Sequence, residues 1–318
     1  MIKNKKDKRE VWDFFVVGGG PVGVAAAIYA GRFMLKTIVV GKEIGGLIVR
    51  THIVENYPGF TSVTGQELMN AFLTHAASMN IPVVEDEVQH ITQKESFLFE
   101  IVCGEKTYYS KTLLFATGSK WRTLDVPGYR EFYAKGVSHC ATCDGAFFKN
   151  KTVAVIGGSD SAAKEALLLT QYAKKVYIIY RGEEIHPEPI NGARVKANQK
   201  IEIINKTNVT EIKGNKMVTD VILDRPFRGR KDIGVDGVFI EIGHIPLSDI
   251  ATSLGVKTND KSEIIVGTDS RTNLPGIYAA GDVTQAPYRQ VITGAAEGVI
   301  AAFSAYEDIG KHEFKKKQ

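Results

Sequence analysis

The sequence is poor in cysteine, with only three in 318 residues, at positions 103, 140 and 143. Three cysteines cannot build the disulfide framework of a small secreted protein. No run approaches about 18 consecutive apolar residues, which argues against a membrane-spanning helix. The charged start lacks the apolar stretch of a signal peptide, so we expect a cytoplasmic protein.

Charge of one sign is not in large excess either. Forty Lys and Arg against 36 Asp and Glu give a net charge of +4. Much of this excess lies in the terminal runs 1–9 and 311–318, which lack interleaved aromatic residues and are expected to be solvated tails. The sequence therefore gives no support for nucleic-acid binding. Its length suits about two domains.

An internal repeat organises the chain. Residues 13–30 and 152–169 each contain a β-rich run, a glycine-rich turn and an alanine-rich helical pattern, and each is followed by a further β-branched run, at 36–40 and 175–180. Two β-α-β units predict an α/β protein with two Rossmann-like nucleotide-binding domains.

No linker of low complexity separates these domains, so we expect the second to be inserted in the first. The predicted boundaries give one discontinuous FAD-binding domain, 1–118 with 245–318, and an NAD(P)-binding-like domain at 119–244. Further strands are expected at 112–116, 218–224, 237–242 and 276–280, with a helix and then a strand between 189 and 207. A polar connection is expected at 225–232, and a buried helix at 290–306.

The first glycine-rich turn matches G-x-G-x-x-G at Gly18, Gly20 and Gly23, between a strand and a helix. In this motif the first glycine permits a tight turn, the second admits a pyrophosphate, and the third lets helix and strand pack closely. The helix N-terminus favours the phosphates, and Glu43 lies where a carboxylate can bind a ribose hydroxyl. The alternative is an ordinary strand–turn–helix without a ligand.

The second turn, residues 157–162, departs from the motif because Ser159 replaces the glycine that a pyrophosphate approaches. After the next strand, Arg181 is the one cation placed for a 2′-phosphate, whereas Glu183 and Glu184 would repel it. Charge alone therefore favours NADH over NADPH. The alternative is a domain that keeps this fold but no longer binds a dinucleotide efficiently.

Cys140 and Cys143 form a C-x-x-C motif followed directly by Asp144. Two cysteines at this spacing can close a small disulfide, and such motifs lower thiol pKa values. Asp144 could exchange a proton as thiol and thiolate alternate. A zinc site is the competing interpretation, but it would need a second C-x-x-C or a histidine pair at ligand spacing. Cys103 is expected to be a core or sheet cysteine.

Together these motifs resemble the low-molecular-weight bacterial and archaeal thioredoxin reductases, which are FAD-dependent pyridine nucleotide-disulfide oxidoreductases. The resemblance runs from Trp12 to Ile309 and includes VVGGGPVG, VENYPG at 54–59, ATG at 116–118, CATCDG at 140–145, GHIP at 243–246 and GDVTQAPYRQVIT at 281–293. It implies a homodimer, an inserted domain that rotates, and a thioredoxin-like protein disulfide as substrate. It also implies that Cys143 faces the flavin, that Cys140 attacks the substrate disulfide, and that Asp144 is the general acid.

The resemblance also implies sites for two cofactors. The residues expected to contact FAD are Gly18, Gly20, Pro21, Gly23, Lys42, Glu43, Gly46, Leu47, Asn56, Val88, Ala116, Thr117, Gly118, Gly281, Asp282, Arg289, Gln290 and Val291. Those expected to contact NADH or NADPH are Gly157, Ser159, Asp160, Ser161, Arg181 and Gly243.

Two departures from the family pattern stand out. Leu47 replaces a glutamine in the GGQ motif, and Tyr180-Arg181-Gly182 with His186 replaces the HRR motif and the further arginine of NADPH-using members. Two alternative functions therefore stay open. One is the same disulfide chemistry with a different electron donor, such as ferredoxin, a deazaflavin or another flavoprotein. The other is a non-catalytic redox sensor that uses the disulfide as a switch.

Overall fold

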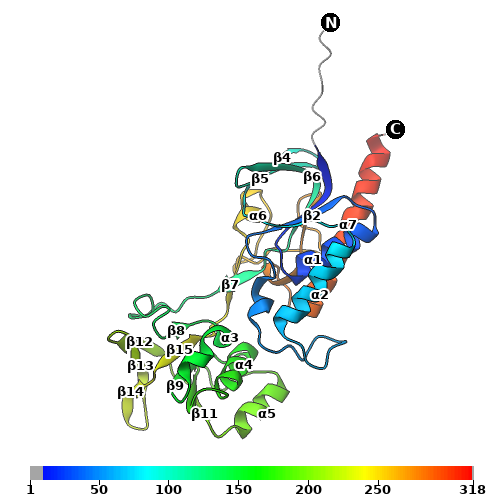
Figure 1. Cartoon of the computed structure of the whole chain (residues 1–318). Helices are drawn as coiled ribbons and strands as arrows, with labels where there is room; N and C mark the ends of the chain where they lie inside the picture. The colour runs from blue at the N-terminus through cyan, green and yellow to red at the C-terminus, as the bar shows by residue number, and fades with distance from the viewer. Residues whose placement is uncertain (1–9, 317–318) are drawn as a thin grey trace. The chain divides into compact units, whose positions relative to one another are not determined.

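The computed structural model describes residues 10–316 and divides the chain into two compact units. One unit contains the chain up to Lys120 together with the chain from Ile245 onward, and the other is Trp121–His244 (Figure 1). Short strands β7 (Ser119–Trp121) and β16 (His244–Pro246) pair where the chain passes between the units. Within the described residues, no helix is both long enough and apolar enough to cross a membrane.

The first unit is built on a seven-stranded sheet in the order β3-β2-β1-β6-β5-β4, with β17 also paired to β6. The strands are β1 (Val11–Val17), β2 (Thr37–Gly41), β3 (Val83–Glu85), β4 (Val88–Glu95), β5 (Leu98–Cys103), β6 (Lys106–Phe115) and β17 (Ile277–Ala279). Strands β1, β2, β3, β6 and β17 run parallel, whereas β4, β5 and β6 form an antiparallel meander.

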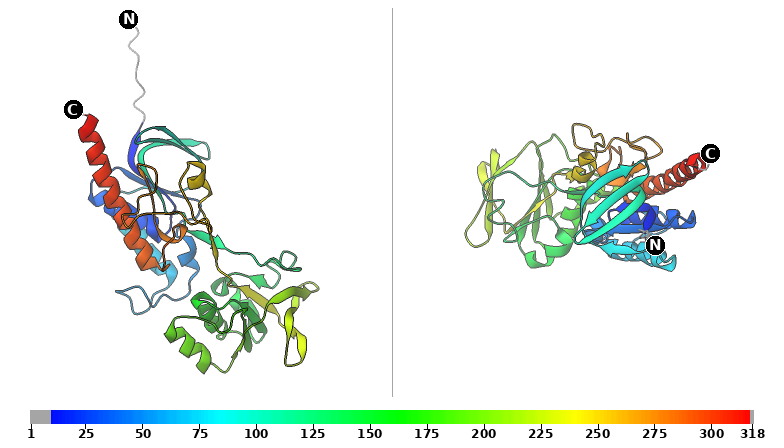
Figure 2. Two further views of the ribbon diagram at one scale, coloured as in Figure 1. Left: turned by 180° about the vertical axis from the view of Figure 1, so that it is seen from behind. Right: turned by 90° about the horizontal axis from the view of Figure 1, so that it is seen from above.

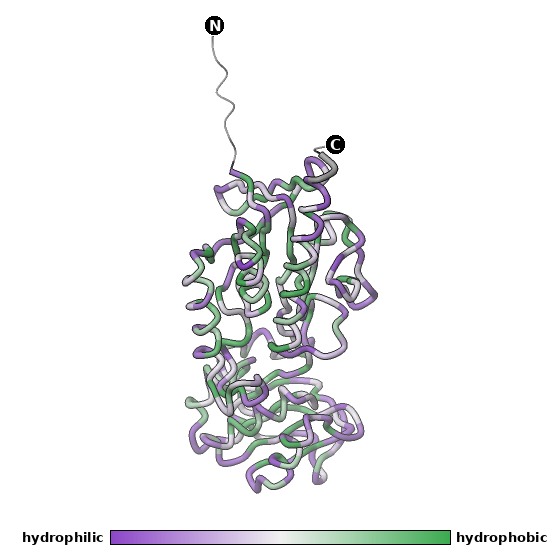
Figure 3. The backbone as a smooth tube through the Cα atoms, turned by 90° about the vertical axis from the view of Figure 1, so that its right-hand side faces the viewer, coloured by the Kyte–Doolittle hydropathy of each residue, from purple (hydrophilic) through white to green (hydrophobic). Residues whose placement is uncertain are grey.

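Alternation along β1 directs side chains to two cores. Phe14 and Val16 belong to a core with the helices α1 (Pro21–Arg32), α2 (Gly65–Ser78) and α7 (Val291–Lys316), while Phe15 and Val17 belong to a core on the other face that includes residues of α6 (Asp249–Ser253). Both views in Figure 2 show α7 alongside α1. Hydrophobic and hydrophilic segments alternate along the chain (Figure 3).

The second unit repeats the arrangement on a smaller scale. Its parallel sheet has the order β11-β10-β9-β15-β8, made of β8 (Val137–Ser138), β9 (Thr152–Ile156), β10 (Lys175–Ile179), β11 (Ile201–Ile204) and β15 (Gly237–Ile240). Helices α4 (Asp160–Leu169) and α5 (Pro189–Ala197) contribute to the core on one face, and an antiparallel sheet of β12 (Val209–Gly214), β13 (Val218–Phe227) and β14 (Arg230–Gly234) to the core on the other. The predicted α/β class with two Rossmann-like domains is confirmed.

Two expectations from the sequence differ from the structure. The segment 225–232 is a β-hairpin and not a connection, because Arg228 and Gly229 both have positive φ and make a tight turn between β13 and β14. Helix α7 continues ten residues beyond Tyr306, so 311–316 is helical and not a tail. The other predicted tail, 1–9, lies outside the described residues. Cys103 is fully buried in β5, as expected.

Candidate functional site

The turn after β1 has the geometry of a phosphate cradle. Gly18 has φ +124°, and a Cβ there would lie 2.2 Å from the Ala116 carbonyl oxygen. A Cβ on Gly23 would lie 2.1 Å from the Gly18 carbonyl oxygen, so this glycine is required for the close packing of α1. At Gly20, in contrast, the nearest atom to a Cβ is 4.0 Å away, and no side chain caps α1. The turn is tight everywhere except at Gly20, where a ligand can approach free helix N–H groups.

The other expected FAD residues of this unit fall into three groups. Gly46 and Leu47 begin the 3₁₀ helix η1 (Gly46–Arg50), and a Cβ on Gly46 would lie 3.4 Å from Gly20. The Ala116–Gly118 segment directly follows β6, the neighbour of β1. Gly281 and Asp282 lie in the 3₁₀ helix η3 (Gly281–Val283) after β17. These segments surround the carboxyl ends of adjacent parallel strands, where ligands bind in such folds.

Polar partners in the same unit come from distant parts of the sequence. The Asn56 amide donates to the Gln290 side-chain oxygen at 3.0 Å, across 234 positions of sequence. Arg289 pairs with Glu263 and donates to the Thr284 carbonyl oxygen. The structure thus brings together Asn56 and Gln290, two residues of the expected FAD set.

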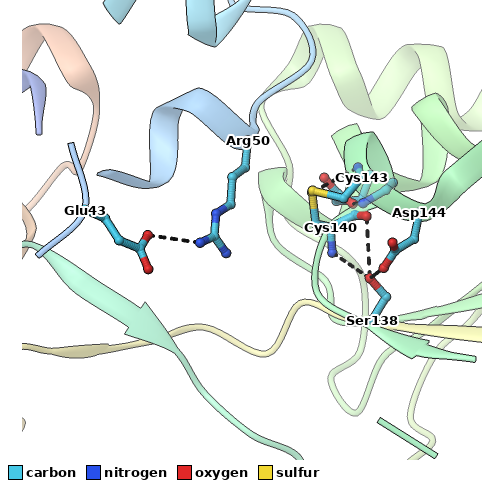
Figure 4. Close-up of a disulfide and its surroundings, with 8 residues drawn as sticks. Glu43, Arg50, Ser138, Cys140, Cys143 and Asp144 are labelled. Atoms are coloured by element: carbon cyan, nitrogen blue, oxygen red, sulfur yellow. Dashed lines mark hydrogen bonds and ion pairs between the residues drawn. A yellow bond between two sulfur atoms is a disulfide. The ribbon is translucent and has the colours of Figure 1, made fainter. Parts of the chain in front are cut away.

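Five further residues of the expected FAD set have less direct placements. Glu43 and Lys42 are exposed, and their side chains pair with Arg50 at 3.0 Å and with Glu87 at 2.9 Å (Figure 4). The Val88 side chain is buried in the hydrophobic core at the start of β4, so only its backbone is available to a ligand. Pro21 and Val291 are the first residues of α1 and α7.

The turn in the second unit has the same backbone but different side chains. Gly157 has φ +151°, and a Cβ there would lie 2.1 Å from the Glu241 carbonyl oxygen. Ser159 precedes α4 with φ −84° and ψ −179°, nearly the values of Gly20 before α1, −79° and 179°. The serine therefore causes no backbone strain, and its side chain projects where the first turn is open.

A carboxylate also lies at the N-terminus of α4. Asp160 accepts hydrogen bonds from the Glu188 N–H at 2.9 Å and the Asn191 amide at 2.8 Å, and pairs with Lys164 at 2.8 Å. Partial burial opposes ionisation of Asp160, but these hydrogen bonds hold its pKa below the usual value. An ionised side chain thus occupies the helix end that would bind a pyrophosphate, and like charge disfavours that ligand.

The other residues expected to bind a nicotinamide nucleotide do not compensate for this charge. Arg181 is exposed after β10, and Glu183 in the same loop pairs with Lys206. The ring of Tyr180 lies against Gly158. Ser161 is exposed on the first turn of α4, and Gly243 lies in the crossing segment, where its carbonyl oxygen accepts from the Arg122 N–H at 2.9 Å. These residues fit a dinucleotide phosphate poorly.

The two cysteines form a disulfide at the start of α3 (Ala141–Asp144), with Cα atoms 5.3 Å apart. The Cys143 N–H donates to the Cys140 Sγ at 3.1 Å, so the helix turn already directs an N–H group at this sulfur. Ser138 accepts from the Cys140 N–H at 3.0 Å and donates to the Asp144 carboxylate at 2.6 Å (Figure 4). This hydroxyl fixes Asp144 beside the pair. Cys140 is 7% exposed.

An aromatic cluster surrounds His139, which precedes the disulfide. Its ring stacks on Trp121, with centroids 5.5 Å apart, and bonds the Tyr129 hydroxyl at 2.9 Å and the Ile240 carbonyl oxygen at 3.1 Å. Burial lowers the pKa of His139, with the Ile240 carbonyl opposing this. A buried imidazole with both nitrogens bonded suits a structural role. Within residues 10–316, no group of three or more His, Cys, Asp or Glu side chains is arranged to hold a metal ion.

Sequence analysis missed two buried carboxyl groups, Glu165 beside the disulfide turn and Glu241, which interacts with Glu165. The Ala141 N–H, between the two cysteines, donates to the Glu165 carboxylate. Burial raises the pKa of Glu165 to about 7, against the lowering effect of that N–H. Burial and then repulsion from Glu165 raise the pKa of Glu241, at the carboxyl end of β15, to about 9. The available signal was a glutamate among the buried alanines and leucines of α4.

Comparison with known proteins places this geometry in a family. The pyridine nucleotide-disulphide oxidoreductase family matches residues 12–298. A thioredoxin reductase of Listeria innocua is 38% identical over 94% of each chain.

Two solved structures are similar over nearly the whole chain. The thioredoxin reductase of Lactococcus lactis has a TM-score of 0.90 and 34% identity, over 94% of this chain and 99% of that one. The thioredoxin reductase of T. acidophilum has a TM-score of 0.89 and 37% identity, over 94% and 98%. This chain therefore belongs to the pyridine nucleotide-disulphide oxidoreductase family and, within it, is an FAD-dependent disulfide oxidoreductase of the thioredoxin reductase group.

Proposed function

We propose that this protein reduces the disulfide of a thioredoxin-like protein, with electrons that pass through the Cys140–Cys143 pair. The observation that carries the proposal is the disulfide at the start of α3, with Asp144 held beside it by Ser138. Neither a metal site nor a passive structural crosslink needs a proton donor so placed. A non-catalytic redox sensor has no use for it either.

FAD fits the first unit. The opening at Gly20, the uncapped start of α1, and the Asn56–Gln290 contact supply sites for a pyrophosphate and for a polar ring system. When bound, FAD supplies the electron pair that opens the disulfide. The set of FAD-binding residues named from the sequence is retained in this proposal, with Val88 acting through its backbone.

The two cysteines and Asp144 have separate roles in thiol–disulfide exchange. Cys143 is the sulfur that receives electrons, and Cys140 is the thiolate that attacks the substrate disulfide. Asp144 protonates the departing thiolate. Because Cys140 is buried, the attack requires a movement that uncovers it, for which we propose a rotation of the inserted unit. A Cys140→Ser protein should lose thioredoxin reduction, and reduction at the full rate would refute the assignment.

The electron donor has two candidates. Membership of the family favours a nicotinamide, and the Glu183–Glu184 pair beside the single Arg181 favours NADH over NADPH. The second candidate is a donor without nicotinamide, such as ferredoxin, a deazaflavin or another flavoprotein. Ser159 and the ionised Asp160 in the second turn favour this candidate.

Anaerobic titration of the yellow holoenzyme separates the donors. Bleaching of the flavin absorbance by modest concentrations of NADH or NADPH would establish a nicotinamide-driven reductase. No bleaching by either nucleotide, followed by full reduction with dithionite, would exclude that donor and lead to a test with reduced ferredoxin.

We also propose that two copies of the chain associate. On the surface of α1 and α7, Tyr29, Phe303 and Tyr306 are 42%, 48% and 47% exposed, and Phe33 contacts all three rings. Exposed apolar clusters of this kind mark interaction surfaces, and a second copy is the occupant that the family resemblance implies. Sedimentation equilibrium of the holoenzyme tests this: a monomer at micromolar concentration would exclude it. We further propose that the protein acts in the cytoplasm, where reducing cofactors are supplied.

A further inference from the structure

Glu165 binds a backbone N–H group of the helical turn that carries the redox disulfide. The N–H of Ala141, the residue after Cys140, donates to the Glu165 carboxylate, while the N–H of Cys143 donates to the Cys140 Sγ. The carboxylate and this sulfur therefore share the donors of a single helical turn. In the oxidised protein the sulfur is neutral and the arrangement has no charge conflict.

Reduction of the disulfide adds charge at this turn. A thiolate on Cys140 would place a second negative charge at the turn that already binds the Glu165 carboxylate. Two buried like charges in contact with one turn disfavour each other. Either the thiol stays protonated or the carboxylate takes up a proton.

We propose that Glu165 is a positioning residue that takes up a proton when the Cys140–Cys143 disulfide opens, so that Cys140 can persist as the attacking thiolate. The reaction balances: the disulfide gains two electrons from a dithiol or the flavin, one proton goes to Cys143 and one to Glu165. The inference deepens the proposed function and rests on it.

The surroundings of Glu165 support this role. Burial raises its pKa to about 7, so modest added negative charge suffices to protonate it near neutral pH. Glu241 is protonated in that range, because its own pKa is raised to about 9. On α4 itself, Asp160 and Lys164 neutralise one another. The other ionisable groups on elements packed against α4 are Asp144 on α3, Arg194 and Lys196 on α5, and Lys175 and Tyr177 on β10.

The inference is tested by equilibrating holoenzyme anaerobically with mixtures of reduced and oxidised dithiothreitol between pH 7.5 and 8.5. Acid quenching, alkylation and mass measurement then give the fraction of open disulfide. The measured quantity is the equilibrium constant for reduction of the protein disulfide by dithiothreitol. Dithiothreitol releases two protons on oxidation, so uptake of two protons by the protein leaves this constant independent of pH. If the protein takes up only one proton, the constant rises about tenfold per pH unit.

We expect the wild-type constant to change little between pH 7.5 and 8.5. Over the same range the constant of Glu165→Gln should rise by up to about tenfold. Glu202→Gln is the matched control, because Glu202 is a carboxylate of the same unit that pairs with Lys175 on β11 and β10, and it should follow the wild type. Coincident curves for Glu165→Gln and the wild type would overturn the inference.

Should Glu165→Gln fail to fold, the wild type and Asp144→Asn decide the question together. The rate of Cys140 alkylation in the reduced protein should report a thiolate throughout this pH range. A thiolate together with uptake of two protons requires a proton acceptor other than sulfur, and uptake of two protons by Asp144→Asn as well excludes Asp144 as that acceptor. Finding Cys140 as a thiol, or an uptake of one proton, would refute the role of Glu165. No thioredoxin is used, so this outcome is independent of the proposed substrate.

Discussion

Replacing Glu241 by glutamine should make the protein more stable than the wild type as pH rises. The Glu241 side chain is almost fully buried, and burial with repulsion from Glu165 raises its pKa to about 9 from an ordinary 4.5. Between these values the folded protein holds a proton that the unfolded chain has released. Its stabilising contribution is therefore complete below pH 4.5 and is lost as pH rises toward 9.

The magnitude follows from the linkage of one proton. Each pH unit inside this range lowers the wild-type free energy of unfolding by at most about 1.4 kcal/mol through this group. From pH 6 to pH 8 the Glu241→Gln variant should gain up to about 3 kcal/mol relative to the wild type. Glu165 is present in both proteins, so its own titration largely cancels from the difference.

Urea unfolding of the holoenzyme at pH 6, 7 and 8 measures this difference. The chain has two tryptophans, Trp12 and Trp121, one in each unit. In a Trp12→Phe background, fluorescence of Trp121 therefore reports the unit that contains Glu241. The Glu202→Gln variant in the same background is the control. A stability difference between Glu241→Gln and its parent that stays constant with pH would show that Glu241 is ionised in the folded protein.

Three further outcomes are expected. Cys140→Ser should keep its flavin and its reduction by dithionite but lose thioredoxin turnover, as measured with insulin or a chromogenic disulfide coupled to thioredoxin. Asp144→Asn should lower the rate of disulfide exchange by about 10²- to 10⁴-fold, the usual contribution of a general acid, in stopped-flow oxidation of the reduced enzyme; an unchanged rate would remove Asp144 from the mechanism. The double variant Ser159→Gly with Asp160→Asn should bleach its flavin at lower NADH concentration than the wild type, and an unaltered titration would show that these side chains do not restrict the nucleotide.

Much of the fold could be predicted because its local signals agree with its long-range pairing. The turn at Gly18 and the turn at Gly157 each follow a β-rich run and open an alanine-rich helix, and both β-α-β units form as expected. The strand expected at 218–224 forms most of β13, but the hairpin turn at Arg228–Gly229 escaped prediction because the flanking residues 225–232 are mostly exposed and include several charged side chains. Such a segment lacks the apolar alternation that distinguishes strands from loops.

The site was predictable to the extent that its chemistry lies in contiguous motifs. Cys140, Cys143 and Asp144 are adjacent in sequence, so their proximity needs no tertiary information. Glu165 is 24 positions from the N–H that it binds, and its contact depends on how α4 packs against α3. The apolar neighbours of Glu165 on α4 indicate a buried glutamate, but nothing in local spacing indicates its partner, so the contact emerges only from the packed structure.

The two glycine-rich turns have one further consequence. Gly20 and Ser159 have nearly the same backbone angles, so the two turns differ in what their side chains do to a ligand and not in how the chain runs. A lineage could therefore lose or regain a nucleotide at the second turn by one or two substitutions, without refolding any element. The inserted unit can then keep its fold and its redox disulfide while the electron donor changes during evolution.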